Sequence, residues 1–159
     1  MKLITHNIFS IGLVLYIASY LSYLSVSAVL LAFPATIFTN ILIDKVGHDG
    51  AGSVPRRTWV THSVVTAPFW GGLAWALTLI IPAALLGVFP PNLSRLAFFV
   101  ALGVLSGWSH LFLDSLTEGG VFGIGRRRRA LGHLSYDNRA MNLGCSALGF
   151  TLFIVALMS

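Results

Sequence analysis

The chain has 159 residues, and only 9% of them are Asp, Glu, Lys or Arg, whereas soluble domains carry roughly 25%. Hydrophobic residues make up 56% of the chain, which is more apolar surface than one small core buries. This composition excludes a soluble globular domain. It indicates a single integral membrane domain that covers residues 1–159.

The charged residues cluster and leave long uncharged blocks that are candidates for transmembrane helices. The stretch from Ile8 to Ile43 holds 36 residues, and as one helix it would be about 54 Å long, against about 30 Å of hydrocarbon. We therefore expect a hairpin of two helices that turns near residues 22–25. Pro34 is expected to kink the second helix or to shift its start. The two expected helices are Ile8 to about Leu21 and about Val26 to Ile43.

Three further crossings follow, and they complete an all-α polytopic bundle of about five helices. Four helices are the alternative. A single crossing before residue 44 would move only the N-terminal tail to the other side, so the distribution of charges barely separates the two paths. Pro68 and Pro82 would kink the third helix, and Gly103 and Gly107 form a GxxxG pattern that permits close helix contact. The expected crossings are Val64–Phe89, Leu93 to about Leu113, and Met141–Met158, with a turn at Pro90-Pro91-Asn92 between the first two.

The basic residues indicate an orientation in the membrane. On the five-helix path the N-terminus and both charged loops share one face, which holds every basic residue except Arg95. The positive-inside rule makes that face cytoplasmic and places the C-terminus outside. Apolar character continues to Ile43, which favours an uncleaved segment over a signal peptide. The single Cys145 implies no disulfide.

The histidines and acids lie at helix ends or loops on the same expected face. His110 and Asp114 are four residues apart, so a helix places them on one side, where they can ligate one divalent ion. Asp44 and His48 have the same spacing, although Gly47 makes helical continuity between them uncertain. Each of these groups alone also fits an ordinary polar residue at the membrane interface.

Taken together, these residues predict a divalent metal site, with zinc preferred and manganese or another ion as alternatives. Histidine and carboxylate ligands with an open position are typical of catalytic rather than structural zinc sites. His48 is a further ligand or a general base, and Asp49 and Glu118 are candidates for the catalytic base. The expected metal ligands are His6, Asp44, His48, His62, His110 and Asp114.

The order of these elements resembles the membrane-bound metal-dependent hydrolases, a family that includes LexA-regulated inner-membrane proteins and archaeal relatives of unknown function. The resemblance rests on His6, Asp44 with His48, the segment Arg57 to Ser63, and His110 to Asp114 followed by Thr117 and Gly119. The ligand types are also distantly similar to those of zinc-dependent phospholipase C and P1 nuclease. That similarity implies phosphoester substrates.

We therefore expect a hydrolase that acts at the cytoplasmic face, on a phosphoester such as a lipid headgroup. Arginines could bind the phosphate, although the four-arginine run also fits a topological signal that meets anionic membrane lipids. A non-enzymatic scaffold or lipid-binding protein is the alternative, and a small transporter is a third hypothesis. No strong nucleic-acid signal appears. The candidate phosphate-binding residues are Arg56, Arg57, Arg126, Arg127, Arg128 and Arg129.

Overall fold

The computed structural model describes residues 1–49, 56–86, 93–124 and 126–159, with the side chain of Asp49 left out. This part of the chain forms five helices, each long and apolar enough to cross a membrane. The helical membrane bundle predicted from sequence is thus confirmed. The helices are α1 (Leu3–Tyr20), α2 (Val26–Gly47), α3 (Thr66–Leu85), α4 (Leu93–Ser115) and α5 (Arg139–Met158).

Several helix boundaries differ from those predicted. Helix α1 begins at Leu3 instead of Ile8, and α2 continues to Gly47 instead of ending at Ile43. Both extensions carry polar side chains, which a hydropathy pattern assigns to loops; in the structure Thr5 and His6 are buried, whereas Asp44 is partly buried and Lys45 is exposed. The third helix begins at Thr66 rather than Val64. The expected turn at Pro90-Pro91-Asn92 and the predicted helix end at 87–89 lie outside the described residues.

The turn between α1 and α2 lies where the sequence predicts it. The Ser25 hydroxyl caps α2 by accepting a hydrogen bond from the Ala28 amide at 3.2 Å. Pro34 and Pro82 both lie inside continuous helices.

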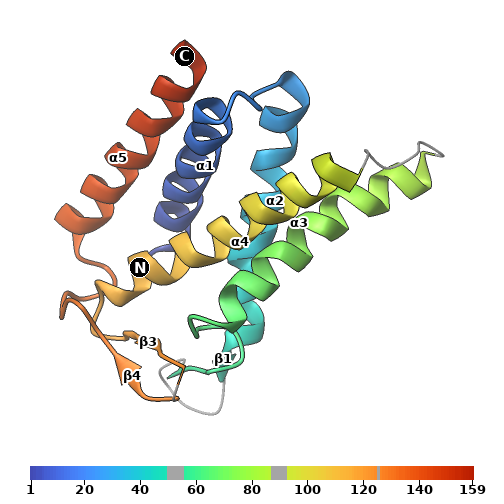
Figure 1. Ribbon diagram of the computed structural model, residues 1–159. Helices are drawn as coiled ribbons and strands as arrows, with labels where there is room; N and C mark the ends of the chain where they lie inside the picture. The colour runs from blue at the N-terminus through green and yellow to red at the C-terminus, as the bar shows by residue number, and fades with distance from the viewer. Residues whose placement is uncertain (50–55, 87–92, 125) are drawn as a thin grey trace.

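The bundle consists of two helix pairs joined by a central helix (Figure 1). Helix α1 packs along α5, and α3 packs along α4, while α2 contacts α1, α3 and α4. The hydrophobic core lies where these elements meet and includes Leu15, Ala35, Trp75 and Leu102. Helix α2, together with a direct contact between α1 and α4, therefore links the two pairs.

Glycines allow the paired helices to approach each other closely. A side-chain carbon at Gly107 would collide with the carbonyl group of Ala67, and one at Gly71 would collide with the carbonyl oxygen of Gly103. Gly12 and Gly149 make the same kind of contact between α1 and α5. The close packing expected at Gly103 and Gly107 is thus present, and its partner is α3.

We expect Gly107→Leu to destabilise the bundle by about 1–3 kcal/mol, because the colliding atoms are backbone and cannot move aside. Thermal unfolding in detergent measures this change. Gly144→Leu is the matched control, since nothing lies within 4 Å of a side-chain carbon at Gly144. Equal melting temperatures for the two variants would contradict the role given to Gly107.

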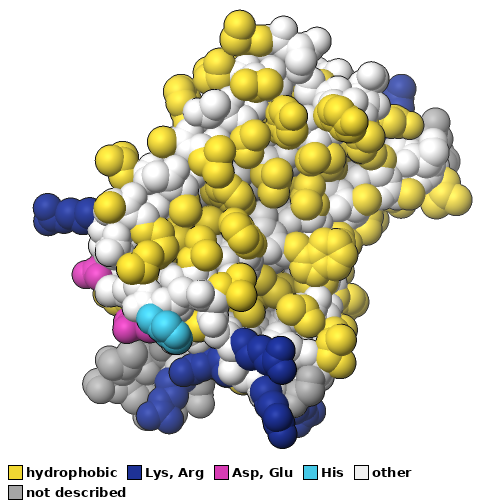
Figure 2. All heavy atoms as spheres, turned by 60° about the vertical axis from the view of Figure 1, so that its left-hand side comes forward, with side chains coloured by type: hydrophobic (Ala, Val, Ile, Leu, Met, Phe, Trp, Pro, Cys, Tyr) yellow, Lys and Arg dark blue, Asp and Glu magenta, His cyan; other side chains and the backbone are white. Residues whose placement is uncertain are grey.

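Charged side chains gather at one end of the molecule, below a surface dominated by hydrophobic residues (Figure 2). Two short antiparallel hairpins lie at this end. In the first, β1 (His48–Asp49) pairs with β2 (Arg56–Arg57), and in the second, β3 (Val121–Phe122) pairs with β4 (Arg128–Arg129). Phe122 also exchanges backbone hydrogen bonds with residues 62 and 64, which fixes the second hairpin against the segment that precedes α3.

Candidate metal centre

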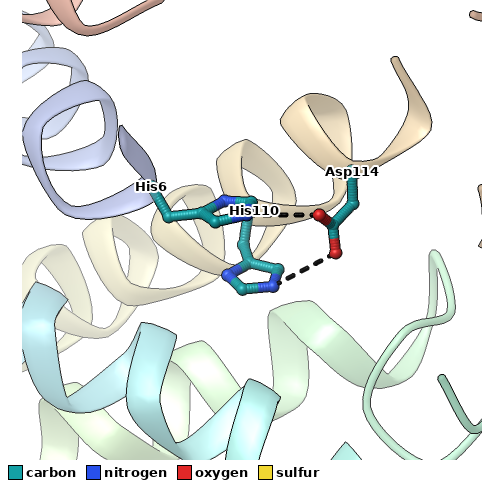
Figure 3. Close-up of side chains that lie close together, drawn as sticks. All are labelled: His6, His110 and Asp114. Atoms are coloured by element: carbon teal, nitrogen blue, oxygen red, sulfur yellow. Dashed lines mark ion pairs between the residues drawn. The ribbon is translucent and has the colours of Figure 1, made fainter. Parts of the chain in front are cut away.

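A cluster of buried ionisable side chains lies at the charged end of the bundle. Helix α1 contributes His6, α2 contributes Asp44, the segment before α3 contributes His62, and α4 contributes His110 and Asp114. Figure 3 shows His6 and His110 both directed toward the Asp114 carboxylate. The structure thus brings together five of the six ligands predicted from sequence, and the sixth, His48, lies at their edge next to Asp44.

Two ring nitrogens of this cluster each face the same two carboxylate oxygens, at separations close to those between ligands of one ion. The Nε2 atom of His110 lies 3.4 Å from both Asp44 Oδ1 and Asp114 Oδ2. The Nε2 atom of His62 lies 3.7 Å and 3.5 Å from the same two oxygens. Four ligands bound at about 2.0–2.1 Å in a zinc tetrahedron lie about 3.3–3.4 Å apart. The separations match that edge length and exceed ordinary hydrogen bonds.

Three of these four atoms are buried polar atoms without a hydrogen-bond partner among the described residues: Nε2 of His62, Nε2 of His110 and Oδ2 of Asp114. Their side chains are at most 1% exposed. An unpaired buried polar group costs about 1–3 kcal/mol, and more when it is charged. Because all three point to one place, a single bound cation would satisfy them together.

Neighbouring residues fix the proton of His62 on the nitrogen that faces away from the cluster. The Thr61 hydroxyl donates its one hydrogen to the carbonyl of Ile43 at 2.8 Å, so it accepts a hydrogen bond from Nδ1 of His62 at 2.9 Å. The lone pair of this imidazole is therefore on Nε2. Burial lowers the pKa of His62, which favours the neutral form that binds metals.

His110 is held in the same way from the opposite side. Its Nδ1 lies 3.0 Å from the side-chain oxygen of Asn40, which accepts the hydrogen bond, and the Asn40 amide group donates to Asn7 at 2.8 Å. The lone pair of His110 is thus also on Nε2. Metal-binding histidines in proteins are typically oriented by such a hydrogen bond from the other ring nitrogen.

The two oxygens of Asp114 have different surroundings. Oδ1 accepts a hydrogen bond from Nη2 of Arg57 at 2.6 Å and from the Met1 amino group at 3.1 Å. Arg57 also donates to the hydroxyl of Thr117 and the carbonyl of Gly120. These contacts neutralise one side of the carboxylate and fix its orientation, so that Oδ2 faces the two histidines.

His6 contacts two of the four proposed ligand residues. Its Nε2 lies 3.2 Å from Asp114 Oδ1, and its ring stacks on that of His110 with centroids 4.0 Å apart. His6, His110 and Asp114 form one group with the spacing of metal ligands, and Asp44, His48 and His62 form a second. Among the described atoms, Nδ1 of His6 has no partner. Direct ligation by His6 stays a prediction, and the contacts indicate that it positions Asp114 and His110.

Gly47 has a steric role at this centre. A side-chain carbon there would collide with the Thr61 hydroxyl and the His62 ring. The Gly47 carbonyl accepts a hydrogen bond from the Thr58 amide at 2.7 Å. Glycine therefore lets α2 remain helical to its end while the segment that carries His62 packs directly against it. The sequence leaves open whether the helix continues through Gly47. In the structure α2 is continuous to Gly47, and His48 is its C-cap residue.

A cavity of about 820 Å³ adjoins the cluster. Asp44, His48, Glu118 and Tyr136 all contribute to its lining. Glu118 and Tyr136 are exposed, whereas His48 is partly buried. Arg56, Arg57 and Arg128 complete the polar lining.

The remaining predicted residues are not part of the cluster, or their side chains are not among those that the structure describes. Arg126, Arg127 and Arg129 are exposed on the second hairpin and its turn, and the guanidinium of Arg126 lies 5.1 Å from the ring of Trp59. The side chain of Asp49 is outside the described part of the chain. A role for these four residues in catalysis or phosphate binding stays a prediction.

Sequence reasoning missed Asn40 and the specific role of Thr61. Asn40 precedes Asp44 by four residues, so the periodicity that placed Asp114 beside His110 would also have placed Asn40 on the face of α2 that carries Asp44. A hydroxyl residue just before a helix, such as Thr61 or Ser63, is typical of a helix cap. Ser63 does accept hydrogen bonds from the Val65 and Thr66 amides, while Thr61 orients His62.

A family model for a protein of unknown function, DUF1286, matches residues 1–113. The chain belongs to this family. The matched range includes His6, Asp44, His62 and His110 and ends one residue before Asp114. The family is one of unknown function, and the match supports neither the resemblance to membrane-bound metal-dependent hydrolases nor the distant similarity to zinc-dependent phospholipase C and P1 nuclease. None of the curated proteins matches the chain, and none of the solved structures does.

Proposed function

We propose that this protein is a membrane-embedded, metal-dependent hydrolase with one catalytic zinc ion held by Asp44, His62, His110 and Asp114. The observation that supports the proposal is the convergence of four ligand atoms at separations of 3.4–3.7 Å, with three of them otherwise unpartnered. His6 would adjoin this set as an additional ligand or as a supporting residue, and His48 would lie beside Asp44 at its edge.

A metal of this kind lowers the pKa of bound water to about 7 and polarises the bond under attack. His48 is the best-placed general base, because it lines the cavity beside Asp44. Its Nδ1 donates a hydrogen bond to the carbonyl of Asp44 at 2.6 Å, which leaves Nε2 with the lone pair that accepts a proton from water. Glu118, which lines the same cavity, is the second candidate.

The substrate that fits this site best is a phosphoester, such as the headgroup of a lipid. Arg56 and Arg128 line the same cavity as the proposed metal ligand Asp44, and guanidinium groups bind phosphate oxygens through paired hydrogen bonds. Arg57 lines it too, while its Nη2 is already bound to Asp114.

Release of inorganic phosphate or of a lipid headgroup tests this proposal. Zinc-loaded protein in lipid nanodiscs is expected to hydrolyse p-nitrophenyl phosphate or a phospholipid, and His48→Ala to lower kcat by about 10²–10⁴-fold with its zinc content unchanged. His133→Ala, which changes an exposed histidine, is the matched control. Metal-loaded protein that cleaves none of a panel of phosphoesters would contradict the phosphoester assignment.

We propose further that the end of the bundle that carries the metal centre faces the cytoplasm, because nearly all basic residues lie toward it. Leu131→Cys in a Cys145→Ala background provides a single cysteine at an exposed position of the second hairpin region. In intact cells this cysteine is expected to resist labelling by a membrane-impermeant maleimide. It should react in inverted vesicles. Labelling of intact cells at position 131 would reverse the assigned orientation.

A further inference from the structure

A groove opens at the end of the bundle opposite the metal centre, between α2, α3 and α4. Its volume is about 1080 Å³, slightly above the roughly 300–1,000 Å³ typical of small-molecule sites. Figure 1 shows α2 separating from the α3 and α4 pair toward this end. Since all three helices are membrane-spanning by length and composition, the groove faces lipid.

The lining of the groove changes from polar to apolar with depth. At the outer end lie the hydroxyls of Ser25 and Ser27, 3.0 Å apart, and Arg95 in the first turn of α4. Residues farther along the helices are apolar except Thr78, whose hydroxyl donates a hydrogen bond to the Ala74 carbonyl of its own helix. The deeper walls include Leu31, Pro34, Leu79 and Phe99.

The single charge on these walls is positive. Arg95 is the only Asp, Glu, Lys or Arg between residues 58 and 113, and it lies away from the basic end of the molecule. A cation and hydroxyls at the mouth of an apolar groove complement a molecule with an anionic head and a long hydrocarbon tail. Leu30 and Leu86, on the rim, are 70% and 76% exposed, so hydrocarbon from the bilayer can reach the groove directly.

We propose that this groove binds one anionic phospholipid, with its phosphate at Arg95 and an acyl chain along Leu31, Leu79 and Phe99. The site is independent of the metal centre, which lies at the other end of the helices. A second protein chain fits the groove less well, because the occupant must combine one anionic end with a narrow apolar body.

Native mass spectrometry of the full chain tests the headgroup. Phosphatidylglycerol is expected to be retained in preference to phosphatidylcholine with the same acyl chains, and Arg95→Ala to weaken phosphatidylglycerol binding about tenfold, the loss of one charge-assisted contact. Arg139→Ala, which changes an exposed arginine at the basic end, is the matched control and should bind as the wild type does. Equal retention by wild type and Arg95→Ala, or loss in Arg139→Ala alone, would overturn the proposal.

Photolabelling of the unmodified protein tests the acyl chain without any variant. Phosphatidylglycerol with a diazirine in its acyl chain is expected to label peptides that contain residues 22–34, 78–86 and 95–99, and excess inorganic phosphate should leave the labelling unchanged. Labelling confined to α1 and α5 would show that the lipid binds elsewhere. Labelling suppressed by free phosphate would show that the headgroup alone determines binding, which contradicts a site built for hydrocarbon.

Discussion

Protein purified in detergent and loaded with zinc is expected to retain about one ion per chain, and His110→Ala and Asp114→Ala to lower zinc affinity by more than about 100-fold. The magnitude follows because loss of an outer-shell partner alone costs 10–100-fold, and these side chains supply two of the four converging atoms. Inductively coupled plasma mass spectrometry and competition with a fluorescent chelator measure content and affinity.

Two further variants make this prediction more stringent. Asn40→Ala removes the acceptor that orients His110 without removing a ligand, so we expect an intermediate loss of about 10–100-fold. His133→Ala also removes a histidine, but one that is exposed and not part of the cluster. Its zinc affinity should equal that of the wild type. Unchanged metal content in both His110→Ala and Asp114→Ala would refute the ligand assignment.

Arg57→Ala is expected to lower the free energy of unfolding by about 3–5 kcal/mol, the usual cost of removing one partner of a buried ion pair. The Asp114 carboxylate, 1% exposed, would lose its shortest contact, at 2.6 Å. The hydroxyl of Thr117 and the carbonyl of Gly120 would lose a donor as well. Denaturation in mixed micelles, followed by circular dichroism, measures the change in metal-free protein.

Arg56→Ala is the matched control for this experiment. Arg56 is the neighbouring residue in β2 and is exposed, so its removal should change stability by no more than about 0.5 kcal/mol. Arg57→Lys should restore only part of the stability, because an ammonium group cannot reproduce the forked contacts of guanidinium. Equal stability of Arg57→Ala and Arg56→Ala would show that the Asp114 carboxylate does not depend on Arg57.

Much of the fold could be predicted from the sequence because membrane crossings depend on the length of uncharged segments, which a sequence displays directly. The boundaries at the charged end could not, since Thr5 and His6 read as loop residues although they are buried within α1. The two-residue strands were missed as well. Strands this short have no periodicity, and backbone pairing with distant residues, such as Phe122 with residues 62 and 64, determines their positions.

The candidate site was predictable where its residues share one helix. The spacing of His110 and Asp114 places both on one face of α4, and the structure has them 3.4 Å apart. The approach of Asp44 to His62 and His110 depends on how α2 packs between the helix pairs, and no local pattern encodes that packing. The partner of Arg57 was hidden for the same reason: the arginine looked like a free phosphate-binding group, but it lies against a buried carboxylate from α4.

The central position of α2 has a thermodynamic consequence. Because Asp44, His62 and Asp114 belong to segments far apart in sequence, an ion bound by all three would close long loops of the chain and tie the ends of α2, α3 and α4 together. The free energy of metal binding would then contribute directly to folding. Metal supply would set how much of this protein stays folded in its membrane, so that abundance, as well as catalysis, would follow the availability of the ion.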